Sequence, residues 1–108
     1  MAEKANIYID RGADFSAQFF LYNEDETPDN NEYSIQAQIR KHALSNSGVN
    51  FSASQSNNTI TISLTSSQTT DLEMGHYIYD IKIQDEDDKI RTAFSGMAIV
   101  NPAATLWD

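Results

Sequence analysis

The segment from Leu72 to Ile83 constrains the fold of this chain more than any other part of it. A polar corner ends at Gly75, and the strand that follows alternates strictly between two faces. Tyr77 comes two residues after that glycine. This is the spacing of a tyrosine corner, in which a buried tyrosine hydroxyl bonds back to the backbone of the corner. The segment therefore predicts a β fold.

Alternation with a period of two recurs along most of the 108 residues and is typical of half-buried strands. Polar segments rich in Asn, Asp, Ser, Gly or Pro separate the alternating stretches and predict turns. In the corner at 66–74, Ser66 or Ser67 is expected to cap one helical turn that presents Leu72 to the core. Gly96 predicts a bulge in the last strand. The predicted strands cover residues 7–9, 14–22, 33–40, 49–51, 59–65, 77–83 and 90–100.

About seven short strands with regular turns predict an all-β fold, an immunoglobulin-like antiparallel β-sandwich. Residues 1–101 are expected to form the sandwich, and residues 102–108 a C-terminal arm. The predicted core consists of inward-facing strand residues and one corner residue. They are Phe15, Phe19, Ile35, Ile39, Ile60, Ile62, Leu64, Leu72, Tyr77, Tyr79 and Ile81.

The charge balance excludes some classes of partner. The chain has 16 acidic and 7 basic residues and a formal net charge of −9. Binding to nucleic acid or to an anionic membrane surface needs clustered Lys and Arg, so neither is expected. The negative charge is explained either by a requirement for solubility or by binding to a basic surface of a partner. Because the chain has no Cys, no signal-like leader and no apolar run of about 20 residues, we expect a cytosolic site of synthesis.

No motif predicts catalysis, a cofactor or a metal. His42 and His76 lie in separate segments with no second ligand at metal-binding spacing. The Gly-x-Ser-x-Gly pattern and a glycine-rich phosphate loop are both missing. A dispersed Ser-His-Asp triad stays open, although nothing points towards one. Residues 24–29 and 85–88 are acidic but lack EF-hand spacing, so solvated turns are expected there.

Four aromatic or aliphatic residues outside the predicted core are candidate interface residues: Phe20, Tyr22, Leu106 and Trp107. Trp107 either folds back onto its own sandwich or anchors an arm that docks on another subunit. Tyr77 and Tyr79 share one strand face. They are interpreted as buried structural residues, with an exposed ligand platform as the alternative.

The ordered motifs resemble a known family. Gly75-His76-Tyr77-Ile78-Tyr79-Asp80-Ile81 is followed by Gly96-Met97-Ala98-Ile99-Val100-Asn101-Pro102. Upstream lie Ile7 to Phe15, Ile35 to Lys41 and Ile60 to Thr65. Together they resemble the small immunoglobulin-like domains of tailed-bacteriophage structural proteins. The similarity extends to the N-terminal domain of siphophage baseplate upper proteins and to short virion proteins of marine T4-like phages.

This resemblance implies a non-enzymatic virion structural protein that is assembled in the host cytoplasm. A tail, baseplate or neck accessory subunit is the expected role, and capsid decoration is an alternative. The implied partners are other virion proteins, with further copies of the chain as an additional candidate. A module that binds carbohydrate or a host surface is the alternative from another class. The family pattern carries no catalytic residue.

Overall fold

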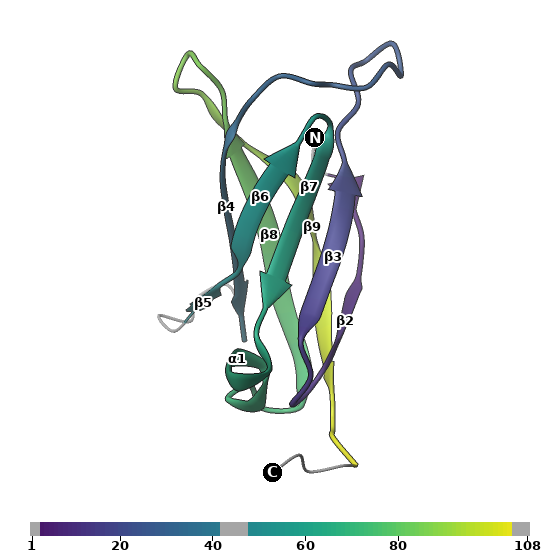
Figure 1. Cartoon of the computed structure of the whole chain (residues 1–108), viewed down its shortest axis with the longest axis vertical. Coiled ribbons are helices and arrows are strands. Elements are labelled where there is room, and N and C mark those ends of the chain that lie inside the picture. The colour runs from purple at the N-terminus through teal and green to yellow at the C-terminus, as the bar shows by residue number, and fades with distance from the viewer. Residues whose placement is uncertain (1–2, 42–47, 105–108) are drawn as a thin grey trace.

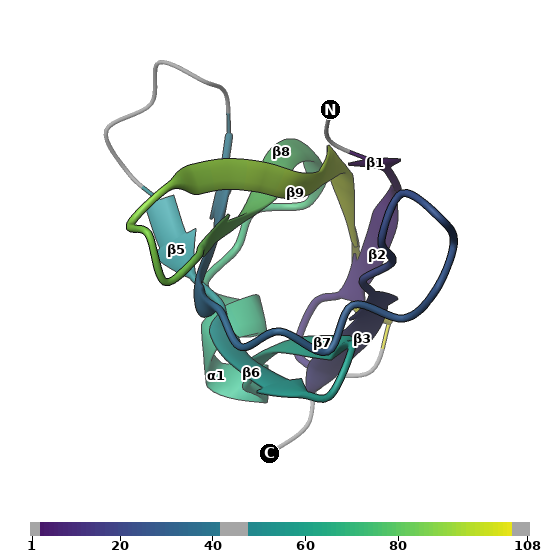
Figure 2. The same ribbon diagram turned by 90° about the horizontal axis from the view of Figure 1, so that it is seen from above.

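The computed structural model describes residues 3–41 and 48–104, which form two β-sheets packed face to face. Figure 1 shows the smaller sheet in front of the larger one, and Figure 2 shows them on opposite sides of the interior. The larger sheet contains β1 (Glu3–Lys4), β2 (Ile7–Asp10), β4 (Ser34–Arg40), β5 (Gly48–Asn50), β8 (Gly75–Gln84) and β9 (Ile90–Asn101). The smaller sheet contains β3 (Phe15–Phe20), β6 (Ser52–Ser56) and β7 (Thr59–Leu64).

The predicted all-β, immunoglobulin-like sandwich is confirmed, but it is not wholly antiparallel. β5, β4, β8 and β9 pair antiparallel in that order, whereas β1 and β2 both run parallel to β9. Parallel pairing is possible here because the chain passes from β2 to β3, in the other sheet, instead of returning as a hairpin. Figure 1 shows this crossing beside the helix.

The segment from Gly48 to Ser56 changes sheets, which is one reason for a strand count above the expected seven. β5 pairs with β4 in the larger sheet, and β6 pairs with β7 in the smaller one. The switch occurs at Phe51, whose side chain is buried and whose amide donates to the Ala37 carbonyl at 2.9 Å. One short alternating stretch therefore contributes to both layers.

The core lies between the inner faces of the two sheets. Nine of the eleven predicted core residues are buried, and Phe15 and Ile35 are partly buried and pack against the same cluster. Phe15 and Ile35 retain some exposure near the ends of their strands. Among the described residues, ten further side chains complete the buried core: Ile7, Ile9, Leu21, Ala37, Phe51, Ile83, Ala93, Phe94, Ala98 and Val100.

The corner before β8 contains the short helix α1 (Ser66–Thr70). Its N-cap is Thr65, so the prediction of Ser66 or Ser67 was wrong. Thr65 has extended backbone angles, and its Oγ1 accepts from the Gln68 amide while Gln68 Oε1 accepts from the Thr65 amide at 2.9 Å. The Ser66 amide donates instead to Asp14 at 2.7 Å. Leu72 is buried, as predicted.

The tyrosine corner is present at the start of β8. Gly75 has a φ of 128°, a conformation that favours glycine, and it turns the chain into the strand. The buried Tyr77 then donates its hydroxyl hydrogen to the Glu73 carbonyl at 2.8 Å. Tyr79 is also buried and donates to the Ala5 carbonyl. Both tyrosines are therefore structural, and neither is an exposed platform.

Gly96 does not form the predicted bulge. The register of β8 and β9 shifts between Ile81 and Lys82, which leaves Ala93 as the extra residue, while Gly96 pairs regularly with Tyr79. A Cβ at Gly96 would lie 2.0 Å from the Ala5 carbonyl oxygen. This glycine is needed because the N-terminal segment, which runs along β9, approaches it closely at Ala5, between β1 and β2.

Two acidic loops lie at the end of the sandwich opposite α1 (Figure 1). The first was predicted to be entirely solvated, which is wrong for Asp29. Asp29 is buried and accepts hydrogen bonds from the Tyr33 hydroxyl at 2.6 Å and the Asn31 amide at 3.0 Å. It therefore anchors the loop to the sandwich. The second loop is the expected hairpin turn between β8 and β9.

Candidate functional site

A shallow groove of about 630 Å³ crosses the outer face of the larger sheet. β1, β4, β8 and β9, together with the link from β1 to β2, provide its lining, so it is assembled from three distant parts of the sequence. We call it the outer-face groove. Its lining residues are Lys4, Asn6, Gln38, Arg40, Ile78, Tyr79, Asp80, Lys82, Ser95, Gly96 and Met97.

Strand register fixes the position of each outward side chain in the groove. Asp80 on β8 lies opposite Gln38 on one side and Ser95 on the other, and Ser95 pairs with Lys4. One polar row therefore crosses four strands. The adjacent row contains Ile78, which lies between Arg40 and Met97.

The second row places two apolar side chains in water. Ile78 is 40% exposed and Met97 is 37% exposed, although both occupy outward positions of central strands. Outward positions of an exposed sheet face are normally polar, because they gain nothing from the core. Their pairing across β8 and β9 gives the groove an apolar floor beside its polar row.

The outer-face groove is basic in an acidic chain. Lys4, Arg40 and Lys82 contribute three positive charges against the single negative charge of Asp80, a formal charge of +2. Since the whole chain carries −9, the remaining residues carry −11. Lys82 Nζ donates to Thr92 Oγ1 at 3.1 Å and lies 3.9 Å from Asp80, and Arg40 donates to Gln38 at 2.7 Å. The contact of Lys82 with Thr92 joins β8 to β9, whereas the other two contacts lie within β8 and within β4.

A smaller groove of about 210 Å³ lies at the seam between β1 and β3. The predicted interface residues Phe20 and Tyr22 line it and are 47% and 58% exposed. Beneath them the core residues Phe19 and Phe94 pack with their ring centroids 4.9 Å apart. This seam groove therefore combines two exposed rings with access to an aromatic pair of the core.

The other predicted interface residues, Leu106 and Trp107, lie outside the described residues, as does His42. His76 is exposed on the outer face of β8, where strand parity predicts it. The choice between a folded-back Trp107 and a docking arm therefore stays a prediction.

The titratable groups with shifted pKa values are structural. Burial raises the pKa of Tyr79 to about 12. The hydrogen bond from Tyr33 to the Asp29 carboxylate raises the pKa of Tyr33. Hydrogen bonds from Thr27 lower the pKa of Asp25 within its own turn. Of these groups only Tyr79 lines the outer-face groove, and its hydroxyl is engaged by the N-terminal segment.

Within residues 3–41 and 48–104, no three His, Cys, Asp or Glu side chains gather closely enough to hold a metal ion. Over the same residues, every buried side-chain nitrogen or oxygen has a hydrogen-bond partner. In this described part of the chain, no helix has the length and apolar character required to span a bilayer.

Sequence reasoning missed the outer-face groove, although one signal for it exists. Ile78 occupies an outward position of β8, between Tyr77 and Tyr79, where a polar residue is expected. Met97 occupies an outward position of β9, between Gly96 and Ala98, in the same way. An apolar residue at an outward position of a predicted strand is the feature that would have marked this face.

Comparison with known proteins adds evidence for the fold alone. No protein-family model matches the chain, and no curated protein matches it. Among solved structures, it is similar to a chain described as a GspB Siglec domain, with a TM-score of 0.54 and 14% sequence identity. The match covers 94% of this chain and 56% of the other, so the chain spans little more than half the length of that relative. The likeness supports an immunoglobulin-like sandwich.

Proposed function

We propose that the chain is a non-enzymatic structural subunit of a tailed-bacteriophage virion, a tail, baseplate or neck accessory that acts through protein–protein contacts. The observation that carries this proposal is the outer-face groove. Its floor exposes Ile78 and Met97 on the two central strands, at positions where the core gains nothing from an apolar side chain. Covering apolar surface of this kind by a partner is favourable.

The arrangement of the groove suits a protein partner. A protein interface typically combines an apolar centre with a polar rim that fixes orientation. Here Ile78 and Met97 form the apolar part, and Lys4, Arg40 and Lys82 form the rim. β8, which lies beneath the groove, is held by backbone pairing on both sides, so the surface is preorganised.

The virion part of the proposal comes from the sequence motifs of β8 and β9. The stretches from Gly75 to Ile81 and from Gly96 to Pro102 resemble phage structural domains. Partners would then be tail, neck or capsid subunits, and the chain would reside in the virion after assembly in the host cytoplasm. Capsid decoration is the alternative position within the same class.

Purified phage particles that are produced from a genome carrying this coding sequence test the proposal. Mass spectrometry of the particles is expected to detect the chain at a fixed ratio to a tail or neck protein. Electron cryomicroscopy should then locate its density on that part of the particle. Complete absence of the chain from purified particles would overturn the proposal, and density on the capsid shell would select the decoration role.

The seam groove supports a second candidate, a module that binds carbohydrate or a host surface. Phe20 and Tyr22 present exposed rings beside Gln18 and Glu3, and aromatic faces with nearby polar groups are suited to hold ligands. A glycan array probed with the isolated chain tests this candidate. Binding that Tyr22→Ala abolishes and Tyr8→Ala leaves intact would favour it over the structural role.

A further inference from the structure

We propose that copies of this chain associate head to tail, with the acidic β8–β9 hairpin of one copy seated in the outer-face groove of the next. The proposal rests on the proposed function in one respect, that the outer face is a protein contact surface. It goes further by naming the partner as a second copy and by naming the segment that occupies the groove.

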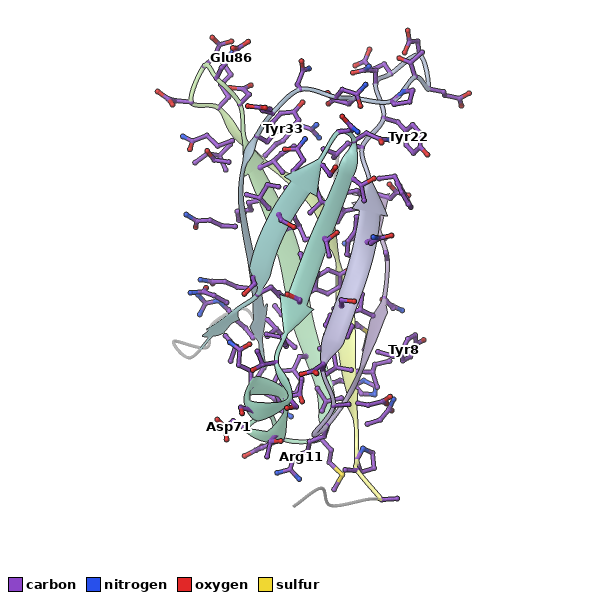
Figure 3. The ribbon with its side chains drawn as sticks, viewed as in Figure 1. Tyr8, Arg11, Tyr22, Tyr33, Asp71 and Glu86 are labelled. Carbon is purple, nitrogen blue, oxygen red and sulfur yellow. The ribbon has the colours of Figure 1, made fainter. Side chains whose placement is uncertain are left out.

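The occupant is a short, well-defined hairpin tip. The Asp85 carboxylate accepts from the amides of Asp87 and Lys89 at 2.9 and 3.0 Å, and the Asp85 amide donates to the Lys89 carbonyl at 3.0 Å. Glu86, Asp87 and Asp88 are left exposed. Figure 3 shows Glu86 at the extreme end of the molecule, away from the body of the sandwich.

The two surfaces are complementary in charge. The outer-face groove has a formal charge of +2, whereas the tip from Asp85 to Lys89 carries −3, from four carboxylates and one lysine. The tip would place carboxylates beside Lys4, Arg40 and Lys82. Such pairs at an interface fix orientation and register more than they add affinity.

They are also complementary in apolar surface. Ile90 follows the hairpin turn directly and is 64% exposed, the largest exposure of any large hydrophobic side chain among the described residues. In the groove, Ile78 and Met97 form an exposed apolar pair. An acidic tip with one adjoining aliphatic residue therefore faces a basic groove with an aliphatic floor.

The contact must join different copies. The hairpin continues β8 and β9, the same two strands that form the floor of the outer-face groove, and it projects beyond their ends (Figure 1). A copy therefore cannot place its hairpin in its own groove. In the head-to-tail arrangement each copy uses its tip on one neighbour and its groove on another, so the interface is heterologous and generates a ring or an open chain of subunits.

The net charge of −9 supports this orientation over others. Two acidic molecules repel each other in most relative positions. The groove is the place where three of the seven basic side chains gather, so docking there avoids contact between like charges. An acidic segment of a different subunit is the competing occupant of the groove. Measuring self-association of the purified chain separates this occupant from the hairpin of a second copy.

Sedimentation velocity of the purified chain, from about 10 µM to about 1 mM, tests the proposal. The wild-type chain is expected to show a weight-average mass that rises with concentration. Lys82→Glu in the groove and Asp87→Lys in the hairpin should each weaken association by about tenfold or more. The double variant, in which the two charges are exchanged, should restore most of the association. Both side chains are exposed, so the variants should keep the fold.

Glu24→Lys is the matched control, because Glu24 is an exposed acid in the other loop at the same end. It makes the same change in net charge as Asp87→Lys and should leave association unchanged. A wild-type chain that stays monomeric throughout, or a double variant as weak as either single variant, overturns the head-to-tail contact. A monomeric chain that still enters virions, with entry lost in Lys82→Glu, assigns the groove to another subunit and leaves the proposed function standing.

Discussion

Two tyrosine hydroxyls tie the corner before β8 and the N-terminal segment to the core. Tyr77 bonds to the Glu73 carbonyl across the corner, and Tyr79 bonds to the Ala5 carbonyl of the N-terminal segment. Each ring is buried while its hydroxyl has a backbone partner, which avoids the penalty for an unpaired buried polar group. The spacing of Gly75 and Tyr77 predicted the first bond, whereas nothing local to Tyr79 indicates its partner 74 residues away.

Removing the corner hydroxyl should weaken the fold without disrupting it. We expect Tyr77→Phe to lower the free energy of unfolding by about 1 kcal/mol, because one hydrogen bond to a partly exposed carbonyl is lost. Urea denaturation measures the change. Tyr22→Phe, on an exposed ring, is the control and should change stability by less than about 0.5 kcal/mol. Equal effects of the two substitutions would show that the corner bond does not stabilise the fold.

Gly96 should tolerate no side chain. In Gly96→Ala the new Cβ would meet the Ala5 carbonyl group at 2.0 and 2.8 Å, so the N-terminal segment must move. We expect a loss of about 3 kcal/mol in unfolding free energy. Gly48→Ala is the control, because there the nearest atoms belong to the flexible Arg40 side chain, and its cost should be much smaller. An unchanged stability in Gly96→Ala would contradict the close approach of the N-terminal segment to Gly96.

Burial of Tyr79 should make the fold sensitive to alkali. Its pKa is raised to about 12, so the unfolded chain releases this proton near pH 10 while the native chain still holds it. The contribution of the protonated Tyr79 to the free energy of unfolding is therefore fully present below pH 10 and is lost as pH rises from 10 to 12. Denaturation across this range should show a shallower decline in Tyr79→Phe than in the wild type. If stability declines equally steeply with pH in the two proteins, the titration of Tyr79 is not the cause of the alkali sensitivity.

At the scale of elements, the strands follow from sequence periodicity, but their partners do not. The alternation of β3, β4, β7 and β8 places apolar side chains on one face, and burial in the structure follows that parity. The parallel pairing of β2 with β9 depends on how the chain crosses between sheets, which no local pattern encodes. The same holds for the change of sheet at Phe51, since period two does not reveal which neighbour a strand takes.

The corner helix depends on its cap. Thr65 and Gln68 satisfy each other's backbone amides at the start of α1, which is too short to be stable by itself. Sequence reasoning placed the cap one or two residues late because three hydroxyl residues stand in a row.

Thr65→Ala should lower unfolding free energy by about 1 kcal/mol, whereas Thr65→Ser, which keeps the hydroxyl, should lower it by much less. Thermal denaturation followed by circular dichroism compares the two. If alanine and serine have the same effect, the hydroxyl of residue 65 is not the stabilising group.

At the scale of the whole molecule, the two ends and the outer face differ in chemistry. The acidic loops, with Glu86 at their tip, occupy the end opposite α1 and Asp71 (Figure 3). The basic outer-face groove gathers residues from four strands that are up to 93 positions apart in sequence, as from Lys4 to Met97. No spacing rule predicts such a set, because register and sheet order bring it together. Only the outward apolar residues could have signalled it in advance.

The central claim is that the outer face is covered when the chain is part of an assembly. Met97 lies on that face and is 37% exposed, whereas Met74 lies in the corner near α1 and is 62% exposed. Hydroxyl-radical footprinting with mass spectrometry reports the oxidation of each methionine. We predict that both are oxidised in the dilute chain and that only Met97 becomes protected in the intact particle. Equal oxidation of Met97 in the free chain and in the particle would contradict the account.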